Sequence, residues 1–82
     1  MRKNHVYILS NKDNRVLYVG VTSNLKHRIR KHKSKFYPKS FTAGYNCDKL
    51  VYFEMYHDIR EAILRENQLK AGNRQRKLDL II

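Results

Sequence analysis

Two short runs of strand-forming residues around a polar turn set the strongest limit on what this chain can fold into. The runs HVYILS (5–10) and VLYVG (16–20) are rich in β-branched and aromatic residues, and NKDN (11–14) lies between them. Such residues favour extended backbone, whereas Asn and Asp favour tight turns. The pattern therefore predicts an antiparallel β-hairpin at the start of the fold.

The length of the turn decides which side chains meet across this hairpin. If residues 11–14 form the whole loop, Ser10 faces Arg15 and Tyr7 faces Tyr18. The two tyrosines then lie on one face of the sheet, with their Cβ atoms roughly 5 Å apart. The sequence thus predicts a tyrosine pair on the hairpin.

The rest of the chain alternates helical and extended signals. Gly20 is expected to permit the turn after the second strand, and the polar residues at 22–24 can cap a helix. Asp58, with Glu61 three residues later, has the spacing of a capping box. The elements expected after the hairpin are a helix over 24–35, a loop over 36–48, a strand over 49–56, a helix over 58–70 and a last helix from Asn73 toward Ile82.

The predicted order of elements is ββαβαα. A small three-stranded antiparallel sheet flanked by helices, which is an α+β fold, would bury the apolar faces of all of them. With 82 residues the chain is near the lower size limit for a self-sufficient core. Residues 1–82 are therefore expected to form one domain.

The chain is strongly basic. Its 18 Lys and Arg against 7 Asp and Glu give a formal net charge of +11, which favours nucleic acid as the partner and an anionic membrane surface second. No apolar run approaches the roughly 18 residues needed to span a bilayer, and no signal-peptide pattern opens the chain. The single cysteine, Cys47, excludes an intramolecular disulfide framework and a multi-cysteine zinc site. We therefore expect an intracellular, cytoplasmic protein.

Two polar residues of the first helix fall on its apolar face. Leu25, Ile29 and Phe36 define that face, with Ile29 about 40° and Phe36 about 20° from Leu25 around the helix axis. His32 falls at about −20°, inside the stripe, and Arg28 at about −60°, on its edge. Arg28 and His32 are therefore expected to look toward the sheet, while the other basic residues of the helix point outward.

The second long helix places a carboxylate among apolar residues. Its apolar stripe consists of Ile59, Ala62, Ile63 and Leu69. Glu66 lies in the middle of this stripe, with Lys70 close by. Because a carboxylate on a buried face is unfavourable unless it is paired or binds a cation, two interpretations stay open: a structural salt bridge to Arg28 or Lys70, or a metal ligand.

Together, Tyr7, Tyr18, Arg28, His32 and Glu66 could line one cleft suited to phosphodiester hydrolysis. A carboxylate can hold a hard divalent cation, which polarises the phosphoryl oxygen, and an arginine can neutralise the charge that grows on the phosphate. A tyrosine hydroxyl could take a proton from the attacking water, either with a pKa lowered by nearby positive charge or through a relay by the histidine. The alternative is that both tyrosines are only wall residues of the sheet.

Five features of the sequence point to one family: HVY at 5–7, YVG at 18–20, Arg28 ten residues after the second tyrosine, His32, and REAILRENQLK at 60–70. Over nearly the whole chain they resemble the GIY-YIG endonuclease superfamily, most closely its small single-domain bacterial members, the UPF0213-like proteins. The two tripeptides stand where the family has Gly-Ile-Tyr and Tyr-Ile-Gly.

The resemblance implies a role for each residue of the cleft. Tyr7 and Tyr18 would activate or position the water, and Arg28 would stabilise the phosphate. His32 matches a position that is often histidine, and Glu66 would bind one divalent cation, Mg²⁺ or Mn²⁺. The implied function is metal-dependent hydrolysis of DNA by an endonuclease or structure-selective nuclease of the bacterial cytoplasm, in DNA repair or recombination.

The chain departs from the family pattern in two places. His5 replaces the first glycine, which matters only if that position needs a special dihedral angle. Superfamily members often have an asparagine near the metal site, for which Asn67 and Asn73 are the nearest candidates. Many of these nucleases carry a separate DNA-binding domain, so a domain this small is expected to select DNA by its structure or through a partner protein.

Basic side chains outside the cleft are candidate phosphate contacts, although any one of them could be only solvated charge. They are Lys26, Arg30, Lys31, Lys33, Lys35, Lys70, Arg74, Arg76 and Lys77. In the long loop, Tyr37, Phe41 and Tyr45 are interleaved with Lys39 and could stack on unpaired bases or pack back on the core. The expected partner is DNA rather than RNA, bound by a monomer.

Two other functions stay open at this point. The chain could be a nucleic-acid-binding module that keeps the nuclease fold but does not cut, or a small basic ribosome-associated protein. The first predicts salt-sensitive binding without metal-dependent turnover. The second predicts that structured RNA outcompetes DNA.

Overall fold

The computed structural model of the chain describes residues 3–34 and 41–81. Predictions that fall on Lys35, Phe36, Tyr37 and Lys39 lie outside these ranges. Within them, the elements in chain order are β1 (Asn4–Ser10), β2 (Leu17–Thr22), α1 (Leu25–Lys33), α2 (Phe41–Gly44), β3 (Lys49–Tyr56), α3 (Ile59–Ala71) and α4 (Arg74–Ile81).

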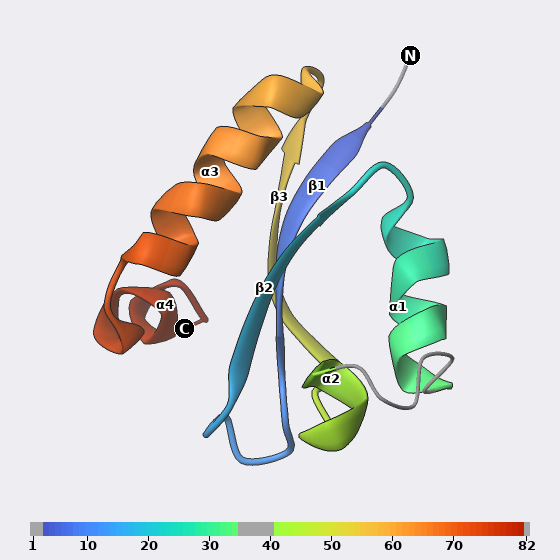
Figure 1. The fold of residues 1–82 in the computed structure, drawn as a ribbon, viewed down its shortest axis with the longest axis vertical. Coiled ribbons are helices and arrows are strands. Elements are labelled where there is room, and N and C mark those ends of the chain that lie inside the picture. The colour runs from blue at the N-terminus through green and yellow to red at the C-terminus, as the bar shows by residue number, and fades with distance from the viewer. Residues whose placement is uncertain (1–2, 35–40, 82) are drawn as a thin grey trace.

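The three strands form one antiparallel sheet in the order β2-β1-β3, with β1 in the centre. Helices α3 and α4 lie on one side of the sheet, and α1 and α2 lie on the other (Figure 1). The predicted three-stranded antiparallel α+β fold is thus confirmed, except that part of the predicted loop forms the short helix α2. In the part of the chain that the structure describes, no helix is long and apolar enough to cross a membrane.

Side chain to backbone hydrogen bonds begin the three longer helices where the sequence predicts. The Oδ1 atoms of Asn24, Asp58 and Asn73 each accept from a backbone N–H two or three residues further on, at 2.9 to 3.1 Å. These bonds satisfy N–H groups that have no partner within the helix. The helix starts are therefore encoded locally.

The hairpin register differs from the prediction. Tyr7 pairs with Gly20, and Tyr18 pairs with Leu9, so the expectation that the two tyrosines face each other directly is wrong by two residues. Side chains alternate between the faces of a sheet with a period of two. A shift of two residues therefore keeps Tyr7 and Tyr18 on the same face, as diagonal rather than direct neighbours.

The loop is two residues longer than predicted because Asn11 closes it with its side chain. Asn11 Oδ1 accepts from the backbone N–H groups of Arg15 at 2.9 Å and of Val16 at 3.0 Å. Asn14 adopts a left-handed φ of 59°, a conformation that asparagine tolerates better than most residues. These bonds take residues 15 and 16 out of the strand, so β2 begins at Leu17.

Two apolar clusters hold the layers together, one on each face of β1. On the α3 face, the buried side chains are Val6, Ile8, Val19, Ala62 and Leu69. On the α1 face they are Tyr7, Leu9 and Cys47, against which Leu25 and Ile29 of α1 pack. Of the stripe predicted on the second long helix, Ala62 and Leu69 are buried, but Ile59 and Ile63 are exposed.

Candidate active site

Tyr7 extends its ring from the central strand over Gly20 of the edge strand β2. A Cβ atom placed on Gly20 would lie 2.5 Å from both Cζ and the hydroxyl oxygen of Tyr7, closer than real Cβ contacts allow. Gly20 lies within β2 and has no left-handed φ, so the expectation that it permits a turn is wrong. Its missing side chain admits the tyrosine ring, which carries the hydroxyl to the sheet edge that lies between α1 and α3 (Figure 1).

Three rings meet at this edge. The ring centroids of Tyr7 and Tyr18 are 6.4 Å apart, and that of His32 lies 6.0 Å from the first and 5.8 Å from the second. The Tyr7 hydroxyl is 3.2 Å from Nε2 of His32, and Nδ1 of the same ring is 2.8 Å from the hydroxyl of Thr42. When Nδ1 donates to Thr42, Nε2 is left as the acceptor of the Tyr7 proton.

Thr42 is a member of this group that the sequence analysis missed. It is buried and belongs to α2, a helix that the sequence did not predict. A buried side-chain partner of this kind fixes the tautomer and the orientation of a histidine ring. No local sequence pattern around Thr42 predicts this contact, because its partner, His32, lies ten residues earlier on another helix.

Burial and charge set the protonation states of the site. Burial raises the pKa of Tyr7 to about 12, and Tyr18 and the Glu66 carboxylate add to the rise while Arg28 opposes it. Burial, followed by the positive charge of Arg28, lowers the pKa of His32. The expectation of a lowered tyrosine pKa is therefore wrong for Tyr7, because burial outweighs the arginine. At neutral pH this residue is a protonated phenol, and His32 is a neutral imidazole.

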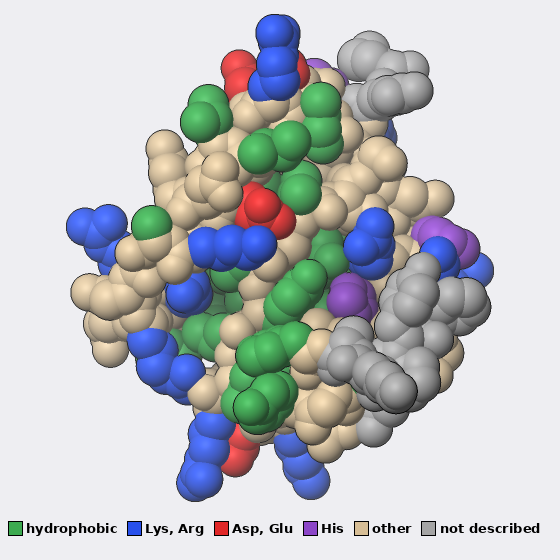
Figure 2. All heavy atoms as spheres, in the orientation of Figure 1, with side chains coloured by type: hydrophobic (Ala, Val, Ile, Leu, Met, Phe, Trp, Pro, Cys, Tyr) green, Lys and Arg blue, Asp and Glu red, His purple; other side chains and the backbone are tan. Residues whose placement is uncertain are grey.

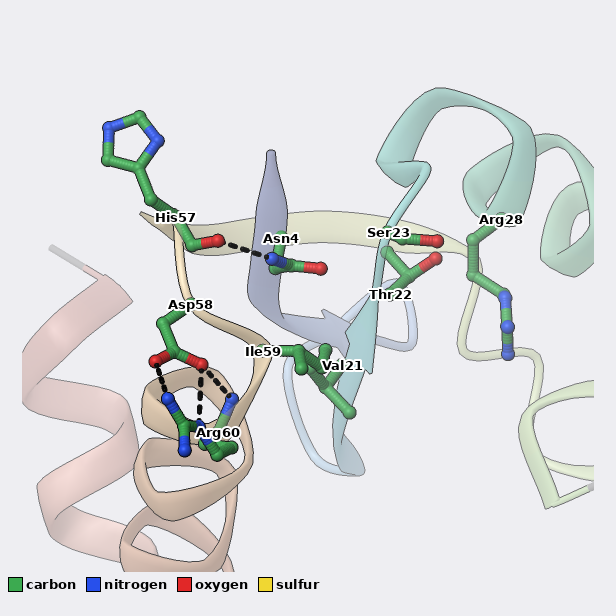
Figure 3. Close-up of a pocket in the computed structure, with 9 residues that line it drawn as sticks. All are labelled: Asn4, Val21, Thr22, Ser23, Arg28, His57, Asp58, Ile59 and Arg60. Carbon is green, nitrogen blue, oxygen red and sulfur yellow. Dashed lines mark hydrogen bonds and ion pairs between the residues drawn. The ribbon is translucent and has the colours of Figure 1, made fainter. Parts of the chain in front are cut away.

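Arg28 stands at the boundary between the ring cluster and an open groove. The groove has a volume of about 730 Å³ and runs along the end of β2 toward the start of α3. Arg28 projects from α1 on the β2 side of this groove, and the ion-paired Asp58 and Arg60 form its other end (Figure 3). Arg28 is exposed, so its guanidinium can reach a bound anion.

Glu66 approaches the same edge from α3. Its side chain is only 15% exposed, and its carboxylate lies 3.5 Å from Nζ of Lys70. The predicted ion pair to Lys70 is therefore present. The side of the molecule seen in Figure 1 has an acidic side chain near its middle, with hydrophobic and basic side chains around it (Figure 2).

The donor set around Glu66 fits a hard cation that takes most of its ligands from substrate and water. A carboxylate oxygen is the ligand type that Mg²⁺ and Mn²⁺ prefer, and Mg²⁺ commonly uses only one or two protein carboxylates. No cluster of three or more His, Cys, Asp or Glu side chains occurs within residues 3–34 and 41–81. At this place the described residues therefore offer a candidate ligand, the carboxylate of Glu66, rather than a cluster of three or more.

The predicted phosphate contacts lie in several places around the fold. Lys26, Arg30 and Lys33 border a groove of about 710 Å³ beside α1. Lys70 pairs with the carboxylate of α3 described above, and Arg74 donates to the backbone carbonyl of Asn14 at 2.7 Å. Of the others, Arg76 is exposed, Lys31 and Lys77 are half-buried, and Lys35 lies outside the described residues.

The departures from the family pattern have simple structural outcomes. His5 has no positive φ, so the backbone does not require glycine there. Its ring packs edge-on against Phe53 at 5.8 Å and is half-buried. Of the two candidate asparagines, Asn73 caps α4 and Asn67 is exposed.

Comparison with known proteins shows which family and which fold the chain resembles. Residues 3–79 match the GIY-YIG catalytic domain. A UPF0213 protein of Clostridium perfringens is 46% identical over 78 residues, which cover 95% of this chain and 82% of that protein. A UPF0213 protein of Syntrophus aciditrophicus is 40% identical over 81 residues, covering 99% and 92%. The solution NMR structure of a UPF0213 protein from Bacillus halodurans superposes with a TM-score of 0.59 at 32% identity, covering 96% of this chain and 82% of that one.

Proposed function

Because the chain belongs to the GIY-YIG family, a nuclease superfamily, we propose that it hydrolyses phosphodiester bonds of DNA with one divalent cation at Glu66. The observation that carries the proposal is the contact between the Tyr7 hydroxyl and Nε2 of His32, made at the sheet edge that Arg28 and Glu66 both approach. Phosphodiester hydrolysis needs a proton acceptor, a group that carries the proton away, a positively charged side chain and a carboxylate close together.

The protonation states favour a relay rather than a tyrosinate base. Tyr7 remains protonated at neutral pH, so its oxygen accepts a proton from the attacking water only as its own proton passes to His32. The neutral Nε2 takes that proton, and the hydrogen bond from Nδ1 to Thr42 holds the ring in place. The histidine, with its lowered pKa, then releases the proton to solvent.

The charged residues act on the phosphate. Arg28 would lie against the non-bridging oxygens, whose negative charge grows in the transition state. Glu66 would hold Mg²⁺ or Mn²⁺, which when bound polarises the phosphoryl oxygen and stabilises the leaving oxygen. Tyr18, beside both other rings, would position the water.

Cleavage assays with matched variants test the proposal. Plasmid, single-stranded and branched DNA are incubated with the protein in Mg²⁺ or Mn²⁺. Arg28→Ala and Glu66→Gln are expected to abolish cleavage, whereas Arg15→Ala and Glu61→Gln remove the same charges from exposed positions and should cut like the wild type. Wild-type protein that cuts none of these DNAs, or site variants as active as their controls, would refute the proposal.

The ion pair between Glu66 and Lys70 supports a second candidate function, that of a nucleic-acid-binding module that does not cut. In that case the carboxylate serves only the lysine. NMR titration of Mg²⁺ or Mn²⁺ into the free protein separates the two functions. A nuclease predicts metal-dependent shifts centred on Glu66, and the binding module predicts none, with DNA affinity that falls steeply with salt.

A further inference from the structure

A row of aromatic rings leads from the candidate active site to the surface. The Phe41 ring lies 6.0 Å from Tyr18, with an angle of 29° between the ring planes, and the Tyr45 ring lies 4.7 Å beyond Phe41. Phe41 is 49% exposed and Tyr45 is 54% exposed. Two large rings are thus left half open to solvent in direct continuity with the tyrosine–histidine cluster.

The fold holds these rings outward. Thr42 and Ala43 are the buried residues of α2, whereas Phe41, at its start, and Tyr45, directly after its end, are exposed. The backbone N–H of Tyr45 donates to the carbonyl of Phe41 at 3.1 Å, and that of Cys47 donates to Thr42 at 2.8 Å. Since Cys47 is fully buried, this short helix is anchored to the core and presents its two rings at a defined position.

Positive charge borders the end of this row. A depression of about 640 Å³ lies beside the chain that leaves α2, where Asn46 follows Tyr45. It is lined by three cations and one anion, Lys12, Lys33, Lys49 and Asp48. Proteins that bind single-stranded nucleic acid combine aromatic rings, which stack on the base faces, with nearby cations, which contact the phosphates.

We propose that Phe41 and Tyr45 stack on unpaired bases of the DNA strand that enters the active site, so that the preferred substrate has a single-stranded segment next to the cleaved bond. In a duplex, each base face is covered by its neighbours and cannot rest on a protein ring. An unpaired base can continue the row that Tyr18 and Phe41 begin. The location of this surface next to the cut rests on the proposed function, but binding to it does not.

Binding without cleavage tests the surface by itself. Affinities for a fluorescent oligothymidine and for a duplex of the same length are measured in the presence of a metal chelator. Phe41→Ala and Tyr45→Ala are each expected to weaken single-strand binding about 5- to 150-fold, which corresponds to about 1–3 kcal/mol, and to change duplex binding little. Phe53→Ala is the matched control, because Phe53 is equally exposed, at 55%, but lies on β3 outside the row.

A spectroscopic variant gives a readout that does not depend on a loss of affinity. The chain has no tryptophan, so Phe41→Trp introduces a single one into the row, and Phe53→Trp does the same at the control position. Quenching of the first by oligothymidine, but not of the second, would support stacking. Thermal melts check that each variant is folded.

The outcomes separate this inference from the proposed nuclease activity. Equal losses on single strands and duplex, a control that loses as much as Phe41→Ala, or the absence of selective quenching would overturn the stacking surface even if the protein cuts DNA. Selective quenching by a protein that never cuts would uphold the surface and refute the nuclease. If an RNA single strand binds much more tightly than DNA through the same rings, the assignment of a DNA substrate is overturned.

Discussion

Replacing Gly20 with alanine would drive a methyl group into the ring that the proposed mechanism depends on. The new Cβ would lie 2.5 Å from Cζ and from the hydroxyl oxygen of Tyr7, and 3.0 Å from Cε1. Tyr7 is 1% exposed and is packed with Leu9 and Cys47, so the ring has no free space into which it can swing. Either the ring or strand β2 must therefore shift.

The expected loss of stability follows from the size of this clash. Forcing one extra methyl group into a packed core typically costs about 1–3 kcal/mol. For a domain of 60–100 residues, each kcal/mol lowers the midpoint of thermal unfolding by roughly 4–8 °C. A loss of about 2 kcal/mol thus means a midpoint lowered by roughly 8–16 °C. The rate of DNA cleavage should fall by more than the loss of folded protein explains, because the displaced hydroxyl of Tyr7 loses its 3.2 Å contact with His32.

A double-mutant cycle measures the clash directly. Leucine at position 7 lacks the three atoms that crowd the new methyl group, so Gly20→Ala should cost less than about 0.5 kcal/mol in a Tyr7→Leu background. Gly44→Ala is the control, since nothing lies within 4 Å of its Cβ and its φ is not left-handed. Urea melts of the four cycle variants and the control give the free energies of unfolding. A Gly20→Ala protein as stable as wild type, or equal costs in both backgrounds, would refute the reasoning.

Three further predictions concern the proton relay and the opposite face of the sheet. Because only neutral His32 can accept a proton, the rate of DNA cleavage should fall as the pH drops through the pKa of this histidine, which is lowered from its ordinary value of 6.5. Above that pKa the rate should stay level, since Tyr7 keeps its proton up to a pH of about 12. A pH–rate profile that rises only in the alkaline range would contradict this prediction. Thr42→Val leaves Nδ1 of the histidine without its partner and should lower cleavage while costing about 1–3 kcal/mol of stability, so unchanged cleavage rates would remove Thr42 from the site. Glu54 on the α3 face accepts hydrogen bonds from Tyr52, from Tyr56 at 2.6 Å and twice from Arg65 at 2.9 and 3.0 Å. Arg65→Met should therefore lower the midpoint of thermal unfolding, because it leaves a carboxylate without its cation, yet spare cleavage at low temperature. An unchanged midpoint would show that the ion pair is not stabilising.

The elements of this fold were predictable because the interactions that define them are local. Asn24, Asp58 and Asn73 begin helices by bonding to backbone groups two or three residues away, a relation visible in the sequence. Periodicity also placed His32 on the inward face of α1, where the structure puts it against Tyr7. The catalytic roles of these residues remain predictions.

The details of the site depended on contacts between distant segments. The hairpin register follows from a loop closed by the side chain of Asn11 and held by Arg74, which comes 60 residues after its partner Asn14. Thr42 reaches His32 from a helix without a sequence signal.

By itself, the sequence determined an antiparallel sheet with flanking helices and a short list of polar residues on inward faces, because strand and helix patterns are set by neighbouring residues. Only the tertiary structure decided that Gly20 makes room for Tyr7 and that burial raises the pKa of this tyrosine to about 12. Both facts depend on how closely separate elements pack, and pattern along a chain carries no measure of that distance.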